Sequence, residues 1–434
     1  MLTEKEERSI EEEQLFDLLP EGWEYTTLGI ACARYGGNIQ TGPFGSQLHA
    51  SDYVPVGIPS IMPKNIGDNR IILDGIARIR PDDASRLSRY LVKEGDIVYS
   101  RRGDVERRAL VRSPEDGWLC GTGCLRVRFG KNDVDSKYAS YFLGHPGVRE
   151  WITRHAHGAT MANLNTSILS TCPFVIPPKN EQRAIAHILG TLDDKIELNH
   201  RLNETLEAMA RALFKSWFVD FDPVRARMEG RDTGLPSHIA DLFPDRLVES
   251  ELGEIPEGWE VKPLGELIDL AYGKALKARS RKNGSVPVYG SNGQVGWHDK
   301  KLVAGPGIVV GRKGNPGTVT WVHGDFFPID TTFFVVPKHE NQSLHFLFFA
   351  LTIQDLSLVA ADSAVPGLNR NLAYMNWQLA PSKIVVDQFS HFANSFFARC
   401  HRLGEESRAL TTLRDALLPK LVSGELRVGS HMGD

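Results

Sequence analysis

The feature that most constrains this chain is an internal repeat. Residues 20–24 (Pro-Glu-Gly-Trp-Glu) recur at 256–260, and a Leu-Gly pair follows each copy. Three further matches keep the same order: 97–103 with 308–314, 163–165 with 367–369, and 212–213 with 416–417. The offset only shrinks along the chain, from 236 to 204. Four collinear matches indicate duplication of one structural unit, with shorter loops in the second copy.

Each copy has a globular part followed by a long helix. The β-branched segments 96–99 and 307–310 are followed by turns containing Gly, Arg and Lys, which is typical of short strands. The density of Gly and Pro predicts a mixed α/β or mostly β globule. In the first copy, Pro177-Pro178 marks the start of a helix that runs to about Phe218.

Both long helices carry heptad spacing. The first has seam positions at Ile185, Leu189, Leu192, Ile196, Asn199, Asn203, Leu206 and Leu213, and the second at Phe389, Phe396, Leu403, Leu410 and Leu417. Each helix could pack on its own globule, but two helices at matching places favour a coiled coil. Asn199 and Asn203 would then fix its register, or else form a solvated break. Arg399 and Glu406 weaken the companion seam of the second helix.

The repeat and the helix signals divide the chain into segments. The predicted segments are an acidic N-terminal segment (1–19), a first globular domain (20–178), a first helix (179–219), a linker rich in Pro, Gly, Asp and Arg (220–254), a second globular domain (255–380), a second helix (381–422) and a tail (423–434). The Gly-Ser-His-Met run in 429–434 resembles the remnant of a cloned protease site, so it carries no functional argument.

Composition excludes several classes of protein. The 434 residues are 41% hydrophobic and 24% charged with a net charge of −4, which argues against a disordered chain and a polybasic DNA binder. No apolar run is long enough to span a membrane, and the acidic N-terminus does not resemble a signal peptide. The five scattered cysteines predict reduced thiols in a cytoplasmic protein, and Cys120 and Cys124 lack a second pair that would complete a zinc site.

The sequence carries no recognisable catalytic motif. It lacks a phosphate-binding loop, a dinucleotide-binding turn, a His-Glu-x-x-His pair and the tetrapeptide that amino-methyltransferases use to hold a flipped base. Asp193 and Asp194 lie on the first long helix, where we expect a solvated face. We therefore expect a binding protein with no catalytic residues, no metal and no cofactor of its own.

Local basic and amide-rich turns are the candidate contacts to nucleic acid. Arg can bind guanine bidentately, and Asn or Gln can pair with adenine, whereas the alternative is ordinary surface-turn chemistry. The candidates are Ser46, Gln47, Lys64, Asn65, Arg101, Arg102, Arg107, Arg108, Lys274, Lys277, Arg279, Arg281, Lys282, Asn292, Arg312 and Lys313. The recurrence of the basic turn at 101–103 and 312–314 favours a functional role.

Taken together, these segments resemble the specificity subunit of a type I restriction-modification system. The most specific block is 177–182 (Pro-Pro-Lys-Asn-Glu-Gln), then the helix, then 212–221 (Ala-Leu-Phe-Lys-Ser-Trp-Phe-Val-Asp-Phe). The repeated Pro-Glu-Gly-Trp, the Gly-Pro-Phe-Gly-Ser turn at 42–46 and the closing 421–426 (Leu-Val-Ser-Gly-Glu-Leu) also fit, so the resemblance runs from Leu19 to Arg427.

The resemblance implies an α+β fold in which two α/β target recognition domains are joined by two long antiparallel coiled-coil helices, related by a pseudo-twofold internal repeat. It implies a DNA sequence-specificity subunit with no catalytic activity. The implied partners are double-stranded DNA, two methyltransferase subunits that use S-adenosylmethionine, and restriction or translocase subunits. The implied setting is the prokaryotic cytoplasm, in host defence.

The residues supply a physical rationale for this resemblance. Antiparallel helices would place the two domains so that each enters the major groove in an equivalent pose, and their different sequences predict an asymmetric bipartite target. A helix of roughly 40 residues is about 60 Å long, which corresponds to about 17 base pairs at 3.4 Å each. The alternatives are a coiled-coil adaptor that binds no DNA and a specificity subunit of a related type II-like methyltransferase system.

Overall fold

The computed structural model describes residues 19–34, 36–130, 134–158, 162–339, 342–361 and 367–428. The expectations for the acidic segment before residue 19 and for 429–434 lie outside these residues. The chain folds into two compact units, one formed by Met1–Glu197 with Ser407–Asp434 and the other by Leu198–Glu406. Each unit contains one globular domain and a part of each long helix.

The first unit contains domain 1, an α/β globule built of short elements. Its strands and helices are β1 (Glu24–Thr27), α2 (Leu28–Ala33), β2 (Asn38–Thr41), β3 (Tyr53–Ile61), β4 (Ala77–Ile79), α3 (Pro81–Arg86), β5 (Ile97–Ser100), β6 (Arg108–Leu110), β7 (Leu119–Cys120), β8 (Cys124–Arg128), α4 (Ser136–Phe142), α5 (Pro146–His155), α6 (Thr166–Thr171) and β9 (Pro173–Ile176). They form an antiparallel sheet in the order β2-β8-β5-β6, a mixed sheet in the order β4-β3-β7 and the pair β1-β9.

The second unit contains domain 2 and the segment that leads into it. Its elements are α8 (Asp222–Met228), α9 (Ser237–Ala240), β10 (Leu247–Ser250), β11 (Gly253–Pro256), β12 (Glu260–Pro263), α10 (Leu264–Leu267), β13 (Ile268–Tyr272), β14 (Val286–Gly290), β15 (Gly293–His298), β16 (Gly307–Gly311), β17 (Val319–Val322), β18 (Phe327–Pro328), β19 (Thr332–Pro337), α11 (Leu344–Ile353), β20 (Ala360–Ala361), β21 (Gly367–Leu368), α12 (Arg370–Met375) and β22 (Trp377–Ala380).

The sheets of domain 2 repeat the plan of domain 1. The antiparallel order β13-β19-β16-β17 matches β2-β8-β5-β6, and the order β15-β14-β18 matches β4-β3-β7. In both mixed sheets the central strand pairs in parallel with a two-residue strand. The pair β12-β22 likewise corresponds to β1-β9. The predicted fold class, with its internal repeat of two α/β domains, is confirmed.

Two of the repeated sequence motifs have structural causes. Gly22 and Gly258 adopt φ values of 82° and 79°, which favour glycine, in the turn before β1 and β12. Gly29 of α2 lies where α6 packs closely against it, and Gly265 of α10 lies where α12 packs closely against it. A Cβ atom at Gly29 would stand 2.8 Å from Ser170 Cβ, and one at Gly265 would stand 2.8 Å from Tyr374 Cβ. The repeated turn and the close approach therefore fix the entry into each domain.

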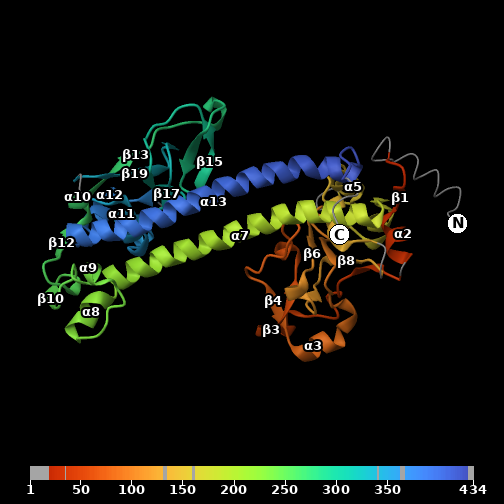
Figure 1. Ribbon diagram of the computed structural model, residues 1–434, viewed down its shortest axis with the longest axis horizontal. Helices are drawn as coiled ribbons and strands as arrows, with labels where there is room; N and C mark the ends of the chain where they lie inside the picture. The colour runs from red at the N-terminus through yellow and green to blue at the C-terminus, as the bar shows by residue number, and fades with distance from the viewer. Residues whose placement is uncertain are drawn as a thin grey trace. The chain divides into compact units, whose positions relative to one another are not determined.

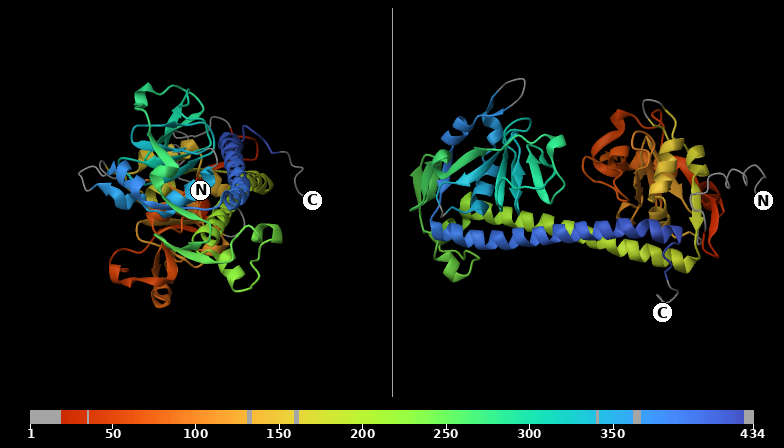
Figure 2. Two further views of the ribbon diagram at one scale, coloured as in Figure 1. Left: turned by 90° about the vertical axis from the view of Figure 1, so that its left-hand side faces the viewer. Right: turned by 90° about the horizontal axis from the view of Figure 1, so that it is seen from above.

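The long helices are α7 (Lys179–Phe218) and α13 (Lys383–Ser423), and within each unit their segments lie side by side and run in opposite directions (Figure 1). In the first unit, Ile185 and Leu189 of α7 share a buried core with Leu421 near the end of α13. In the second unit, Phe214 near the end of α7 packs edge-on against Phe389 near the start of α13, with 5.6 Å between ring centroids. Figure 2 shows the two helices beside each other in a second direction of view. The antiparallel pairing agrees with the predicted coiled coil.

The heptad positions lie along this pairing with unequal burial. Five are buried, namely Ile185, Leu189, Asn199, Phe389 and Leu403, and eight are half-buried, namely Leu192, Ile196, Asn203, Leu206, Leu213, Phe396, Leu410 and Leu417. Near the end of α13 the buried positions are Leu418, Leu421 and Val422. In a straight α-helix, positions seven residues apart are rotated by about 20° around the helix axis. Positions counted strictly in sevens therefore move away from the buried face along a helix of this length.

A polar pair interrupts the apolar seam in the second unit. Asn199 is fully buried, and its Nδ2 donates to Glu406 Oε2 at 2.9 Å on the facing helix. Each of these two polar residues interrupts the heptad pattern of its own helix, but in the structure they form a hydrogen bond with each other. A buried asparagine whose hydrogen-bond partner is the exposed Glu406 on the facing helix favours one register over its alternatives.

The segment 220–254, which the sequence predicts to be a linker, contains ordered elements. Beyond α7 the chain forms α8, α9 and the β10–β11 hairpin, and Val224, Ile239 and Phe243 join the buried core of the second unit. The Phe243 ring packs edge-on against Trp217 of α7, with 5.1 Å between ring centroids. The Pro and Gly residues that suggested a linker instead punctuate these short elements.

Candidate nucleic-acid interface

The repeated arginine turn occupies the same place in both domains. Leu164 N donates to Arg101 O at 2.9 Å in domain 1, and Leu368 N donates to Arg312 O at 2.8 Å in domain 2. Two of the four repeated sequence motifs, 97–103/308–314 and 163–165/367–369, are thus held together by one equivalent hydrogen bond in each domain. The glycine that follows the basic pair has a φ of 75° in domain 1 and 88° in domain 2, so each turn needs a residue without a side chain.

These turns lie at the end of the four-stranded sheet where β5 and β16 finish, which we call the loop end. The loop end comprises 42–43, 62–65, 101–103, 121–123 and 162–163 in domain 1, and 273–274, 290–293, 312–315, 329–331 and 367–370 in domain 2. Loops carried by a rigid sheet are suitable for recognising a ligand. The loop end is therefore the candidate interface in each domain.

In domain 2 the loop end gathers four of the predicted contacts. Lys274, Asn292 and Lys313 are exposed, and Arg312 is half-buried. Asn292 Oδ1 accepts from Asn315 Nδ2 at 2.7 Å, which leaves the Asn292 amide nitrogen available as a donor. The Arg312 Nη1 group donates to the backbone oxygen of Asp330 at 3.2 Å. The fold thus brings together predicted side chains from three separate loops.

Two residues at this loop end or directly beside it, Tyr272 and Arg370, were missed from the sequence. The Arg312 guanidinium lies over the ring of Tyr272, with its Cζ 4.8 Å from the centroid, and the Arg370 guanidinium lies over the same ring at 4.9 Å. Tyr272 is 49% exposed at the end of β13, and Arg370 is the first residue of α12. Tyr272 lies in β13, Arg312 in the turn after β16 and Arg370 in α12, so no local pattern in the sequence points to their association.

Domain 1 presents a different set of side chains at its loop end. Lys64 and Arg102 are exposed, and Arg101 is half-buried with its Nε atom buried and without a hydrogen-bond partner among the described residues. Arg107 is exposed just beyond the turn and pairs with Asp104 at 2.8 Å. The backbone scaffold is shared by the two domains, whereas the side chains are not.

Two predicted contacts are wrong because they are buried. Asn65 is fully buried, and its amide donates to the backbone oxygens of Ile72 and Asp74 at 3.0 and 3.3 Å. Arg108 is only 4% exposed, and its Nε donates to the backbone oxygen of Ser140 at 2.7 Å. Burial also lowers the pKa of the Arg108 guanidinium. Both side chains stabilise domain 1 from within.

The other candidates lie away from the loop ends. Gln47 Oε1 accepts from the backbone of Phe44 and from the Tyr90 hydroxyl, so its amide braces a turn in which Ser46 is exposed. Lys277, Arg279 and Lys282 are exposed between β13 and β14, and Arg281 donates to the backbone oxygen of Val295 on β15.

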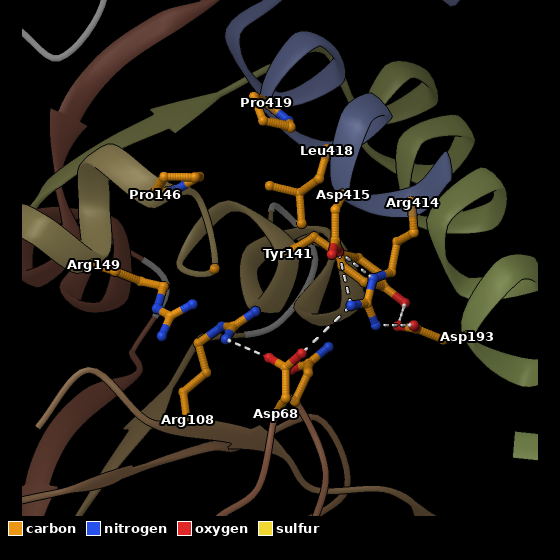
Figure 3. A pocket seen from close by; sticks show the side chains of 12 residues that line it. Asp68, Arg108, Tyr141, Pro146, Arg149, Asp193, Arg414, Asp415, Leu418 and Pro419 are labelled. Carbon is orange, nitrogen blue, oxygen red and sulfur yellow. Dashed lines mark hydrogen bonds and ion pairs between the residues drawn. The ribbon is translucent and has the colours of Figure 1, made fainter. Parts of the chain in front are cut away.

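A polar pocket lies where domain 1 meets both long helices (Figure 3). Arg414 of α13 donates to Asp193 of α7 at 2.8 Å, and its guanidinium is 3.6 Å from Asp68 of domain 1. Asp68 is also 3.5 Å from the Arg108 guanidinium. This chain of charges surrounds a cavity of about 270 Å³ and connects the recognition domain to α7 and α13.

Asp193 corrects the expectation of a solvated face on α7. Its side chain is 15% exposed, and Oδ2 accepts a hydrogen bond from the Tyr141 hydroxyl at 2.6 Å. Burial and the nearby Asp193 carboxylate raise the pKa of Tyr141. Burial lowers the pKa of Arg414, but its hydrogen bonds to Asp193 and Asp415 outweigh this effect and leave the pKa raised. The carboxylate therefore works as an internal ion-pair partner between the helix and the domain.

The described residues contain no group of three or more His, Cys, Asp or Glu side chains that could hold a metal. All five cysteines are free, and burial raises the pKa of Cys32 and of Cys120 to about 12. Such thiols stay protonated at neutral pH and are poor nucleophiles or metal ligands. Within the described residues, no helix is long and apolar enough to cross a membrane.

The two repeats match a known protein family. The family model of the type I restriction modification DNA specificity domain matches residues 52–208 and 256–370, one stretch in each repeat and together more than half of the chain. The chain belongs to this family. It is accordingly a non-catalytic DNA-recognition component of a type I restriction-modification system.

Individual relatives match over nearly the whole chain. The type I restriction enzyme HindI specificity subunit of Haemophilus influenzae is 26% identical, over 85% of this chain and 95% of its own length. The MjaIX specificity subunit of Methanocaldococcus jannaschii is 24% identical, over 86% and 87%. In fold, the chain resembles the crystal structure of a type I S subunit from M. genitalium, with a TM-score of 0.60, 19% identity and coverage of 94% and 98%.

Proposed function

We propose that each domain reads one half of an asymmetric bipartite DNA target in the major groove. One observation carries this proposal: the same arginine turn, braced by the same hydrogen bond, stands at the loop end of both domains. Arginine is suited to bidentate contacts with guanine, and lysine to phosphate contacts. Because Lys64 of domain 1 and Asn292 of domain 2 occupy equivalent loops, the two half-sites should differ in sequence.

We further propose that α7 and α13 set the distance between the half-sites. Each is one continuous helix, of 40 and 41 residues, and a helix of that length spans about 60 Å. The hydrogen bond from the buried Asn199 to Glu406 supports a single register, which a measuring element requires. About 17 base pairs is then the upper limit for the span of target and spacer.

The helices also support docking of methyltransferase subunits. Leu198, Leu202 and Met209 of α7 are 49%, 36% and 49% exposed and lie on one face of the helix. Exposed apolar side chains in a row are typical of a surface that a partner covers. In this proposal two methyltransferase subunits bind S-adenosylmethionine and methylate the target, restriction or translocase subunits complete the assembly, and the complex works in the prokaryotic cytoplasm.

Co-expression with the cognate methyltransferase and sequencing of the methylated bases test the proposal. We expect one discrete motif made of two different half-sites and a fixed spacer. Binding of duplex DNA by the purified complex should fall steeply with salt, since basic side chains displace counterions. Methylation without a discrete motif, or no DNA binding by the complex, would instead support an adaptor that binds only proteins.

A further inference from the structure

Arginines and aromatic rings alternate at the loop end of domain 2. The Arg312 and Arg370 guanidiniums both lie over the ring of Tyr272, and their second neighbours are Phe333 at 5.7 Å from Arg312 and Tyr374 at 5.8 Å from Arg370. We call these five residues the arginine ladder. Stacking on aromatic rings holds a guanidinium in a fixed plane, because the cation is attracted to the ring face.

Hydrogen bonds fix the ladder to the backbone from both sides. Arg312 Nη1 donates to Asp330 O at 3.2 Å, and Arg370 Nη1 donates to Leu270 O at 3.4 Å. The Tyr374 hydroxyl donates to Asp269 Oδ1 and accepts from Leu270 N, both at 2.8 Å. Arg370 also begins a helix whose N-terminus is capped by the Asn369 side chain. The side chains are therefore ordered before any ligand binds.

The ladder retains unused donors. A guanidinium has five N–H groups, and within the described residues each of these two arginines gives hydrogen bonds to one backbone oxygen. The Nε atom of Arg370 is buried without a partner among the described residues. Lys274 and Lys313 add positive charge to the same loop end. A ligand here must accept hydrogen bonds in a plane, as the O6 and N7 atoms of guanine do in the major groove.

Domain 1 has no equivalent of the ladder among its described residues. Thr41 precedes Gly42 as Tyr272 precedes Gly273, and both glycines donate to the strand that follows in the sheet order. Thr166 follows the capping residue Asn165 as Arg370 follows Asn369. Only the arginine of the repeated turn is shared. The ladder is thus an addition to the common scaffold and belongs to one half-site.

We propose that the arginine ladder is the guanine-reading element of domain 2, with Arg370 as a specificity-determining residue and Tyr272 as the residue that positions it. The inference rests on the proposed function and deepens it, because it assigns a base to one half-site. Bidentate pairing with guanine is worth about 1–3 kcal/mol, so losing it should cost roughly 5- to 150-fold in affinity.

The test uses the complete complex with its methyltransferase subunits and duplexes carrying the methylated motif. Each guanine of both half-sites is replaced in turn by 7-deazaguanine, which lacks the N7 acceptor. We expect one position in one half-site to weaken binding by the native complex, and the same replacement to have no effect on the Arg370→Ala complex. Arg370→Lys, which keeps the charge without the planar fork, should retain general DNA binding and lose discrimination at that position.

Tyr272→Ala should also reduce discrimination, and Tyr272→Phe, which keeps the ring, should restore it. Arg246→Ala, which removes an exposed arginine that pairs with Glu257, is the matched control and should bind as the native complex does.

Equal weakening of every duplex by Arg370→Ala, with guanine sensitivity unchanged, would overturn the inference. A discrete motif in which no guanine depends on Arg370 would also overturn it while leaving the proposed function intact. Absence of any discrete motif would defeat the proposed function itself.

Discussion

At the scale of single residues, the glycines of the Leu-Gly pairs are predicted to be required by packing. A methyl group at Gly265 would meet Tyr374 Cβ at 2.8 Å, a separation that forces a neighbour to move. We expect Gly265→Ala to destabilise the protein by about 1–3 kcal/mol, the usual cost of overpacking. Urea unfolding measures this change.

The matched control for this substitution is Gly45→Ala. A methyl group at Gly45 would have no heavy atom within 4 Å, and the residue lies in an exposed turn, so the free energy of unfolding should change by less than about 0.5 kcal/mol. Equal losses at both glycines would mean that backbone flexibility, and not close packing against α12, explains the repeated Leu-Gly pair.

A histidine cluster in the second unit predicts acid sensitivity. His345 of α11 stacks on Trp321 with 4.6 Å between centroids, and His323 stacks on His401 of α13, which lies 3.7 Å from Glu405. Burial lowers the pKa of His345 to about 4, and burial and His401 lower that of His323 to about 4. Each of these two histidines is therefore neutral in the folded protein at pH 7.

As the pH falls, these histidines take up protons in the unfolded chain near pH 6.5 but in the folded protein only near pH 4. The protein should therefore lose stability as the pH falls from about 6.5 to 4, and these groups should not affect its stability above that range. His345→Phe keeps the stacking ring and removes the titration. We expect the melting temperature of this variant to fall less than that of the native protein between pH 7.5 and 5, by the equivalent of about 1 kcal/mol after allowance for solvent screening. Parallel pH profiles of the two proteins would contradict this origin of acid sensitivity.

At the scale of elements, Arg414 joins domain 1 to both long helices. Its side chain is 18% exposed and contacts Asp193 and Asp68, so removal leaves the Asp193 carboxylate without its cation, whereas Asp68 keeps Arg108. We expect Arg414→Ala to destabilise the protein by about 2 kcal/mol. The exposed pair Arg154–Glu150 is the matched control, and Arg154→Ala should cost less than about 0.5 kcal/mol.

Thermal unfolding measures both variants, and a double-mutant cycle of Arg414→Ala with Asp193→Ala isolates the pair. A coupling energy near zero would show that the ion pair does not hold the domain to the helices. The same network explains why the sequence misjudged Asp193. Its partners Tyr141 and Arg414 lie 52 and 221 positions away, so helical spacing alone indicated a solvated carboxylate.

At the scale of the whole molecule, the repeated motifs could be predicted from the sequence. The side-chain contacts that occur in only one of the two domains could not. Collinear motifs and heptads revealed two domains and two long helices, because each depends on local spacing. The contact of Arg108 with Ser140 and the stacking of Arg370 on Tyr272 join distant segments of one domain, whereas Asn65 is buried in a local turn whose hydrogen bonds reach only to Ile72 and Asp74. The side chains that distinguish the two domains are positioned by such contacts between distant segments. The DNA specificity of each domain is therefore harder to predict from the sequence than its fold.

The continuity of α7 and α13 leads to the last prediction, a change of spacer length. The variant carries seven additional residues in each helix, inserted at facing positions next to the Asn199–Glu406 pair. Each helix then becomes about 10.5 Å longer, and its end is rotated by only about 20°. At 3.4 Å per base pair, the spacer of the methylated motif should grow by up to about three base pairs, with both half-sites unchanged. Insertion into α7 alone breaks the pairing and should abolish methylation. Sequencing of methylated bases distinguishes these outcomes, and an unchanged spacer in the doubly extended protein would show that the helices do not measure the target.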